Sequence, residues 1–115
     1  MEFLALIHAS EDGWESLSDD EKQAVYKRYM DFSERSEVVG GAELQETTTA
    51  TTVRVRNGDT MVTDGPYAEV KEALGGFFIL EAPSIDDACR LAAEIPAAEH
   101  GAIEVRPVYS RAEES

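Results

Sequence analysis

The apolar positions of the chain gather in short runs that predict strands. Phe3–Ile7 is almost continuously apolar and Phe77–Leu80 entirely so, and such runs are typical of strands that are buried on both faces. Ala102–Val108 instead alternates apolar and polar positions over Ile103 to Arg106, which indicates a strand with one polar face. We therefore expect a sheet whose inner strands are apolar on both sides.

Two other stretches have helical spacing. The first follows a capping-box signature, Ser18 with Glu21 three residues later. We expect this helix to run from Asp19 to about Glu37, with Gly40-Gly41 as its stop signal. Its inward stripe should be Val25, Tyr29 and Phe32.

The second helix should begin after Ser84 and run to about Ile95. Its expected inward stripe is Ile85, Ala88, Cys89 and Ala92. A thiol on that stripe would act as a small hydrophobic group, so Cys89 is a poor candidate for a nucleophile.

A hairpin is expected between the two helices. Thr47–Arg56 is rich in β-branched residues, and Asn57-Gly58 is a strong hairpin turn signal before Thr60–Thr63. The predicted order is thus β-α-β-β-β-α-β. This order is that of an α+β fold, a ferredoxin-like split βαβ with an added hairpin strand.

The fold leaves one face of the sheet uncovered, because both helices should lie on the other face. Two strands are apolar on both sides, so we expect a second copy of the chain to cover the open face, giving a homodimer with facing sheets. Residues 1–109 should form a single domain, and residues 110–115 a solvated tail.

The formal charge of −14 over 115 residues narrows the range of partners. It opposes binding to nucleic acid or to an anionic membrane. Cys89 is the single cysteine, and Phe3–Ile7 is too short for a signal segment or a membrane span, so we expect a cytoplasmic protein.

The most distinctive stretch is Asp64–Gly76, which begins Asp-Gly-Pro and ends Gly-Gly. Gly65 can adopt positive φ and Pro66 fixes its own φ, so a rigid turn is expected. Acidic and basic residues then precede an apolar strand.

On this motif, with Gly41–Gln45, Ala50–Arg54 and Glu104–Pro107, the chain resembles the DGPF family, which belongs with the YCII-related proteins. Tyr67 stands where the family name has phenylalanine. The resemblance spans Phe3 to Val108 and implies a dimeric α+β barrel of ferredoxin-like subunits. It also implies frequent association with sigma factors of the extracytoplasmic-function type, and a His/Asp pair in the related YCII proteins.

Three residues are candidates for acid–base chemistry: His8, Asp64 and His100. His8 ends the first strand and His100 precedes the last, which should lie beside the first, so both could meet at one sheet end with Asp64 as partner. The alternatives are an Asp64 that caps its own turn, a hydrogen-bonded His8 and a solvent-exposed His100.

A polar or anionic ligand could be held by residues of the motif and of the polar strand faces, namely Arg54, Tyr67, Glu69, Lys71 and Arg106. The alternative is surface ion pairing, including a Glu104–Arg106 pair. No phosphate loop, HExxH or Cys/His spacing occurs, so we expect no cofactor and no metal.

Two functions remain open from the sequence. The first is binding of a small polar or anionic metabolite beside Asp64-Gly65-Pro66, with or without His/Asp acid–base catalysis. The alternative is a non-catalytic regulatory interaction protein linked to a sigma factor.

Overall fold

The computed structural model describes residues 1–110, and within them it contains six strands, three α-helices and two 3₁₀ turns. The predicted tail begins at residue 110, and residues 111–115 lie outside the described part. In chain order the elements are β1 Glu2–Ala9, α1 Glu11–Glu15, α2 Asp19–Ser33, β2 Val38–Glu43, η1 Thr47–Thr49, β3 Thr51–Arg56, β4 Asp59–Asp64, β5 Ala73–Glu81, α3 Ile85–Ala92, η2 Pro96–Glu99 and β6 Ala102–Pro107.

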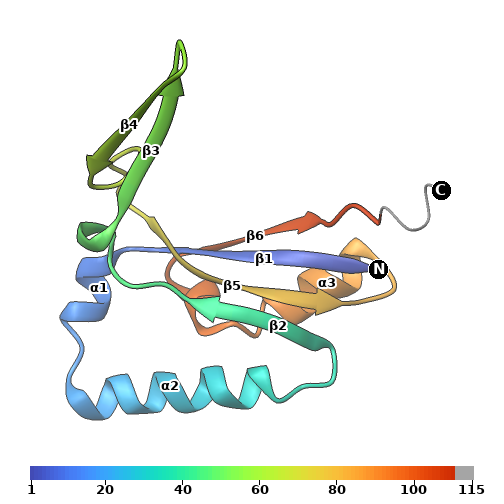
Figure 1. The fold of residues 1–115 in the computed structure, drawn as a ribbon. Helices are drawn as coiled ribbons and strands as arrows, with labels where there is room; N and C mark the ends of the chain where they lie inside the picture. Colours follow the sequence, from blue (N-terminus) through green and yellow to red (C-terminus); the bar gives the residue numbers. More distant parts are fainter. Residues whose placement is uncertain (111–115) are drawn as a thin grey trace.

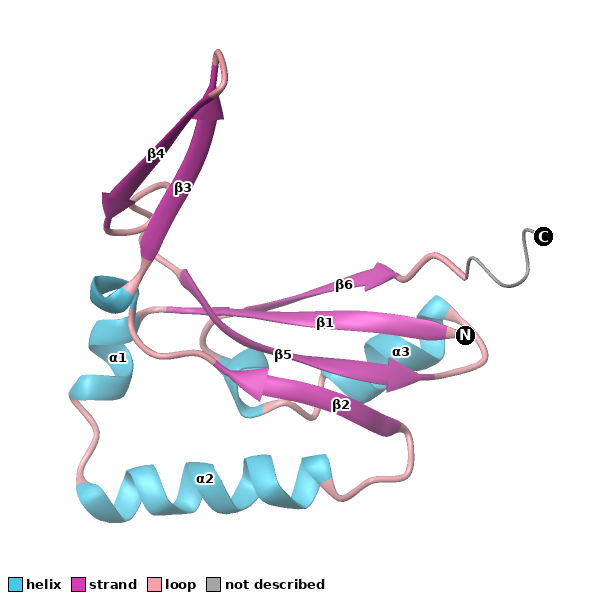
Figure 2. Ribbon diagram, in the orientation of Figure 1, coloured by secondary structure: helices cyan, strands magenta, loops and turns pink. Residues whose placement is uncertain are grey.

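Four strands form the main sheet in the order β2-β5-β1-β6, with antiparallel pairing throughout (Figure 1). β1 and β2 therefore run in the same direction with β5 between them, which is the split βαβ arrangement of a ferredoxin-like fold. The helices α2 and α3 lie on one side of this sheet (Figure 2). The α+β fold class predicted from the sequence is confirmed.

The strand β2 was not predicted, and it changes the interpretation of Gly40-Gly41. Helix α2 ends at Ser33 rather than near Glu37, and both glycines lie within β2. A Cβ on Gly41 would lie 2.5 Å from the Phe77 carbonyl oxygen. These glycines allow β2 to approach β5 closely, so the prediction that they stop the helix was wrong.

The predicted hairpin forms, but as a separate two-stranded sheet. Asn57 and Gly58 both have positive φ, 53° and 82°, as the tight hairpin turn requires. β3 begins at Thr51, because Thr47–Thr49 forms a 3₁₀ turn. We call residues 51–64 the arm; it projects from one end of the main sheet, on the side away from α2 and α3 (Figure 1).

The hydrophobic core lies between the main sheet and the two longer helices. Phe3 and Leu80 are fully covered, and Phe32 of α2 packs edge-on against Phe78 at a centroid distance of 5.0 Å. Tyr29 stacks beside the same ring, and its burial raises the pKa of its hydroxyl. The predicted inward stripe of α2 is thus the one that faces the sheet.

Helix α3 begins after the predicted cap, Ser84, whose hydroxyl accepts a hydrogen bond from the Asp87 amide. Its buried positions are Ala88, Leu91 and Ala92. Cys89 is exposed, and so is Ile85, so the predicted stripe was shifted. The helix ends at Ala92, so it is shorter than predicted. Leu91 rather than Cys89 lies on the side of the helix that faces the core.

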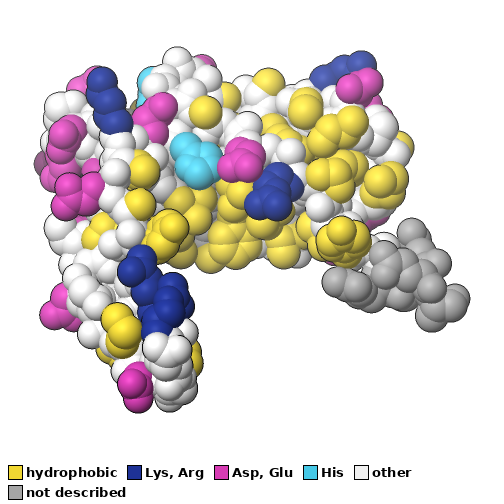
Figure 3. Space-filling view, turned by 90° about the horizontal axis from the view of Figure 1, so that it is seen from above, with side chains coloured by type: hydrophobic (Ala, Val, Ile, Leu, Met, Phe, Trp, Pro, Cys, Tyr) yellow, Lys and Arg dark blue, Asp and Glu magenta, His cyan; other side chains and the backbone are white. Residues whose placement is uncertain are grey.

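The face of the main sheet away from the helices is uncovered, and we call it the open face. The strand alternation places Leu4 and Leu6 of β1 on this face beside Ile79 and Phe77 of β5, and all four remain partly exposed. Figure 3 shows the resulting hydrophobic surface, with charged and histidine side chains at one side of it. The shortest dimension is only 19 Å, and the radius of gyration of 16.4 Å exceeds the roughly 13–14 Å of a compact domain of this length.

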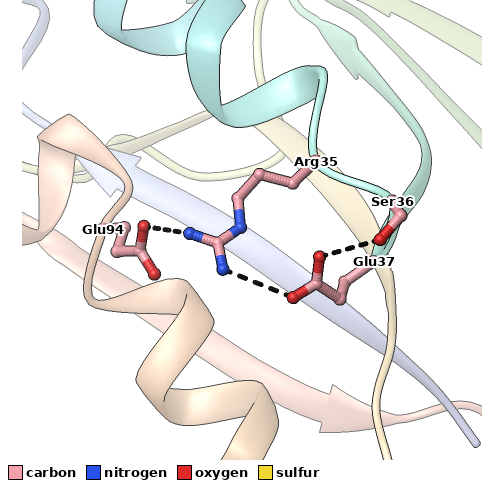
Figure 4. A network of polar contacts seen from close by, with 4 residues as sticks. All are labelled: Arg35, Ser36, Glu37 and Glu94. Atoms are coloured by element: carbon pink, nitrogen blue, oxygen red, sulfur yellow. Dashed lines mark hydrogen bonds and ion pairs between the residues drawn. The ribbon is translucent and has the colours of Figure 1, made fainter.

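Ion pairs on the opposite side tie α2 to the elements around α3. Arg35 bridges Glu94 and Glu37 (Figure 4), and Arg28 binds both carboxylate oxygens of Glu99 at 2.9 and 3.0 Å. Arg28 lowers the pKa of the Glu99 carboxyl and has its own pKa raised. Arg28, Glu94 and Glu99 are solvent-exposed and Arg35 and Glu37 partly so, and such surface ion pairs add little to stability.

Candidate functional site

His8 lies near the end of β1 on the open face, next to a carboxylate. Its Nε2 atom is 3.1 Å from Oε1 of Glu104 on β6. The imidazole is half-buried, whereas Glu104 is exposed. An imidazole hydrogen-bonded to a carboxylate can hold a proton or bind an anion when it is protonated.

Glu104 was not foreseen as the partner of His8. In the register of β1 and β6, His8 is opposite Ala102 and Leu6 is opposite Glu104. His8 and Glu104 therefore share a face as diagonal neighbours, a separation that long side chains can bridge. The alternation of apolar and polar residues in each strand indicates which face His8 and Glu104 occupy. It does not give the register of β1 against β6, which decides whether the two side chains meet.

His100 lies at the same end of the sheet, immediately before β6. The next residue, Gly101, packs so closely on β1 that a Cβ there would overlap the His8 carbonyl oxygen. The two histidines are thus carried by adjacent backbone segments. His100 itself is exposed, and the described residues show no contact between the two imidazoles.

Asp64 closes the arm at its base, opposite Thr51. The turn after it is held by the Gly65 amide, which donates to the Ala50 carbonyl oxygen at 2.7 Å, and by the Thr52 hydroxyl, which donates to the Gly65 carbonyl oxygen at 2.8 Å. Within residues 1–110 the Asp64 carboxylate accepts no hydrogen bond. The turn therefore forms without its side chain, and the carboxylate stays exposed and available.

The remaining motif residues are exposed around the same base. The Arg54 guanidinium lies 5.3 Å from the centre of the Tyr67 ring, and Tyr67 is 79% exposed. Glu69 and Lys71 lie in the connection between β4 and β5 and form no ion pair among the described residues. A cation–π contact thus joins the arm to the connection between β4 and β5. Among the described residues, Glu69 and Lys71 add no ion pair to this contact.

Arg106 lies on the open face, opposite Leu4 of β1. It forms no ion pair with Glu104, because the Glu104 carboxylate is directed to His8. Arg106 therefore adds a positive charge to the apolar face, on the same strand as Glu104. The sequence-based alternative of a Glu104–Arg106 pair does not occur here.

The base of the arm is anchored to the body through Glu11 of α1. Its carboxylate accepts from the Thr47 hydroxyl at 2.6 Å and from the Thr47 amide at 2.8 Å. These hydrogen bonds, that of the hydroxyl first, lower the pKa of the Glu11 carboxyl. The short helix α1 thus positions the base of the arm, a role that the sequence pattern did not indicate.

The candidate residues gather at one end of the molecule but do not enclose a pocket. Two shallow hollows are found elsewhere: one of about 180 Å³ between α3 and β6, beside Cys89, and one of about 300 Å³ beside β2, lined in part by Val39 and Phe78. Among residues 1–110 no group of three or more His, Cys, Asp or Glu side chains is placed to hold a metal ion. None of the helices described there is long and apolar enough to cross a membrane.

Comparison with known proteins agrees with this architecture. The model of the YCII-related domain matches residues 1–111. An uncharacterized protein of Rhizobium meliloti (strain 1021) is 37% identical over 100 residues, which cover 81% of this chain and 78% of that protein. The family model's match runs from β1 through β6, so it includes the arm and the open face. The chain belongs to the YCII-related family.

Proposed function

We propose that the protein binds a small polar or anionic metabolite on the open face, at the end bordered by Asp64-Gly65-Pro66, and that it does so as a homodimer. The observation that carries this proposal is the His8–Glu104 pair, 3.1 Å apart beside the apolar side chains of the open face. Ligand sites typically combine an apolar lining with a few polar groups of this kind. The Asp-Gly-Pro motif supports placing the chain with the DGPF branch of the family.

The positive groups of the open face, the arm and the connection after it favour an anionic ligand. Arg106 lies on the open face, Arg54 lies at the arm, and Lys71 lies in the connection between β4 and β5. None of the three has a carboxylate within ion-pair distance among the described residues, although the chain carries a net charge of −14. Basic side chains that form no ion pair, in a protein with this many acidic residues, are suited to binding a negatively charged ligand.

A second copy is needed to turn this surface into a pocket. A single subunit leaves Leu4, Leu6 and Phe77 partly exposed on the same face as His8. This surface forms one wall of a binding site, and a single subunit provides no second wall. Apolar sheet faces of this size are usually covered. Sedimentation at micromolar concentration should therefore show a dimer, and a stable monomer there would contradict the proposed assembly.

The same pair of residues supports an acid–base step on a bound metabolite. In that step the His8 imidazole would take or give the proton, and Glu104 would orient the ring. Asp64 and His100 lie at the same end of the sheet. They would contact the ligand directly and would not pair with His8. The lone cysteine, Cys89, is compatible with the cytoplasmic location that we propose.

A thermal-shift screen against a library of phosphorylated and carboxylated metabolites tests this function. A ligand that raises the melting temperature of the wild type should lose most of its effect with His8→Gln and part of it with Asp64→Ala. Asp59→Ala is the matched control, because Asp59 is an exposed carboxylate at the opposite end of the arm. If Asp59→Ala weakens the shift as much as His8→Gln does, the ligand binds elsewhere.

The exposed arm is the observation that favours the second candidate, a regulatory protein that binds another protein such as a sigma factor. Val53, Val55 and Val62 lie on one face of the arm and are largely uncovered. This candidate predicts that no metabolite shifts the melting temperature and that arm substitutions abolish binding of the partner protein.

A further inference from the structure

The arm cannot be explained by the contacts it makes within its own subunit. Thr52 is the single residue of β3 and β4 that is even half-buried. Val53, Val55 and Val62 are 60%, 58% and 65% exposed, and they share one face because Val53 is paired with Val62. A two-stranded hairpin without cover is marginally stable in water, so the arm is built to pack against something.

Two arginines occupy the other face of the arm. Arg54 and Arg56 are two residues apart on β3, and neither has a carboxylate within ion-pair distance in residues 1–110. In the body, Lys27, Arg28, Arg35 and Arg90 each pair with a carboxylate, whereas Lys22 and Arg106 form no ion pair within residues 1–110. Figure 3 shows basic side chains of the arm on the side toward the open face.

A matching pair of negative charges lies at the far end of the open face. Glu2 of β1 and Glu81 of β5 are directly opposite each other, and alternation from the buried Phe3 and Leu80 places both on the open side. Like charges directly opposite across two strands destabilise a sheet. The amino terminus pairs with Glu81 at 2.6 Å, and no cation of the described residues pairs with Glu2. An external cation would relieve this repulsion.

The dimensions allow a second copy to bring the two pairs together. Packed sheets lie about 10 Å apart, and a strand advances about 3.3 Å per residue. Arg54, three residues beyond the start of β3, therefore lies about 10 Å along the arm from its base. This distance along the arm is similar to the spacing between two stacked sheets. If the two-fold axis lies between the facing sheets and perpendicular to their strands, the arm of one subunit lies at the Glu2–Glu81 end of the other.

We propose that the arm is a clasp that acts between subunits, in which Arg54 and Arg56 of each subunit pair with Glu2 and Glu81 of a second copy seated on its open face. This inference rests on the proposed homodimer and adds to it the orientation of the facing sheets and the residues that fix it. The candidate site near His8 is then closed by the body of the second copy.

A charge-swap experiment with the full chain tests the clasp. Variant one carries Arg54→Glu and Arg56→Glu, and variant two carries Glu2→Arg and Glu81→Arg. Each alone places like charges at both clasps, so sedimentation equilibrium should show at least about a tenfold weaker dimer for each. A mixture of the two variants restores opposite charges at both clasps, so it should form heterodimers about as strong as the wild-type dimer.

The control is Lys27→Glu with Arg90→Glu, which changes the net charge by the same amount as variant one at exposed positions of α2 and α3. Circular dichroism of each variant establishes that it is folded. The clasp is overturned if variant one dimerises as the wild type does, if the control weakens the dimer equally, or if the mixture forms no heterodimer. A wild-type chain that is monomeric would overturn the proposed dimer and the clasp together, whereas a dimer that is insensitive to variant one would overturn the clasp alone.

Discussion

In the body of the protein, Phe3, Phe32 and Leu80 are almost completely covered by the sheet and the two longer helices. In the arm, Val53, Val55 and Val62 keep more than half of their surface exposed. Both regions have well-formed strands and clear sequence signals, but only the body buries the apolar surface that stabilises a fold. The body therefore has its own hydrophobic core, whereas the arm and the open face leave apolar side chains exposed, and the proposed second copy would cover them.

The largest expected effect comes from opening a cavity in the body. Leu80→Ala removes a fully buried side chain between β1 and β2 and should lower the free energy of unfolding by about 2–5 kcal/mol. Val62→Ala in the arm should change it by less than about 0.5 kcal/mol in dilute solution. Urea denaturation of both variants measures this, and equal losses would show that the arm is part of the cooperative body.

Glycine substitutions should separate the two regions next. Gly101→Ala would drive a methyl group into the His8 backbone, so we expect a loss of about 1–3 kcal/mol and a displaced His8–Glu104 pair. Gly65→Ala meets no atom but forces alanine to a φ of 107°, which should loosen the arm and leave unfolding of the body within about 0.5 kcal/mol of the wild type. Amide exchange together with urea denaturation distinguishes the two outcomes, and a loss of body stability from Gly65→Ala would argue against their independence.

The smallest expected effect is a pH dependence at the base of the arm. The pKa of Glu11 is lowered by its hydrogen bonds to Thr47, so these bonds add stability above the ordinary carboxyl pKa of about 4.3 and lose it as the pH falls through the lower folded value. The protection factor of the amides near Thr47, which is the intrinsic exchange rate at a given pH divided by the observed rate, should therefore fall in acid. In Glu11→Gln the acid-dependent part should be absent, and an unchanged pH profile in that variant would assign the effect to another carboxyl.

Most of the fold could be predicted because its signals are local. The Ser18–Glu21 capping box, the Asn57-Gly58 turn and the run Phe77–Leu80 each act over a few residues. Gly40-Gly41 misled the prediction, because a pair of glycines is as suited to a close strand contact as to the end of a helix. Here the glycines lie in a strand because they pack against β5, which is more than thirty residues further along the chain.

The candidate site could be predicted less well, because it depends on register and on tertiary contacts. His8 and His100 were expected at one sheet end, and the pairing of β1 with β6 brings their backbones together. The partner of His8 is Glu104 rather than Asp64, which depends on how two distant strands align. The Glu11–Thr47 anchor joins helix α1 to the 3₁₀ turn η1 and has no periodic pattern in the sequence.

The central claim is that the arm gains its cover from a second copy of the chain. Amide hydrogen exchange, measured as a function of protein concentration, tests it most directly. Amides of β1 and β5 that are paired in the main sheet should be protected at every concentration. Amides of β3 and β4 should exchange rapidly in dilute solution and gain protection in step with dimer formation by sedimentation. Arm amides that are equally protected, or equally unprotected, across the monomer–dimer transition would contradict the account.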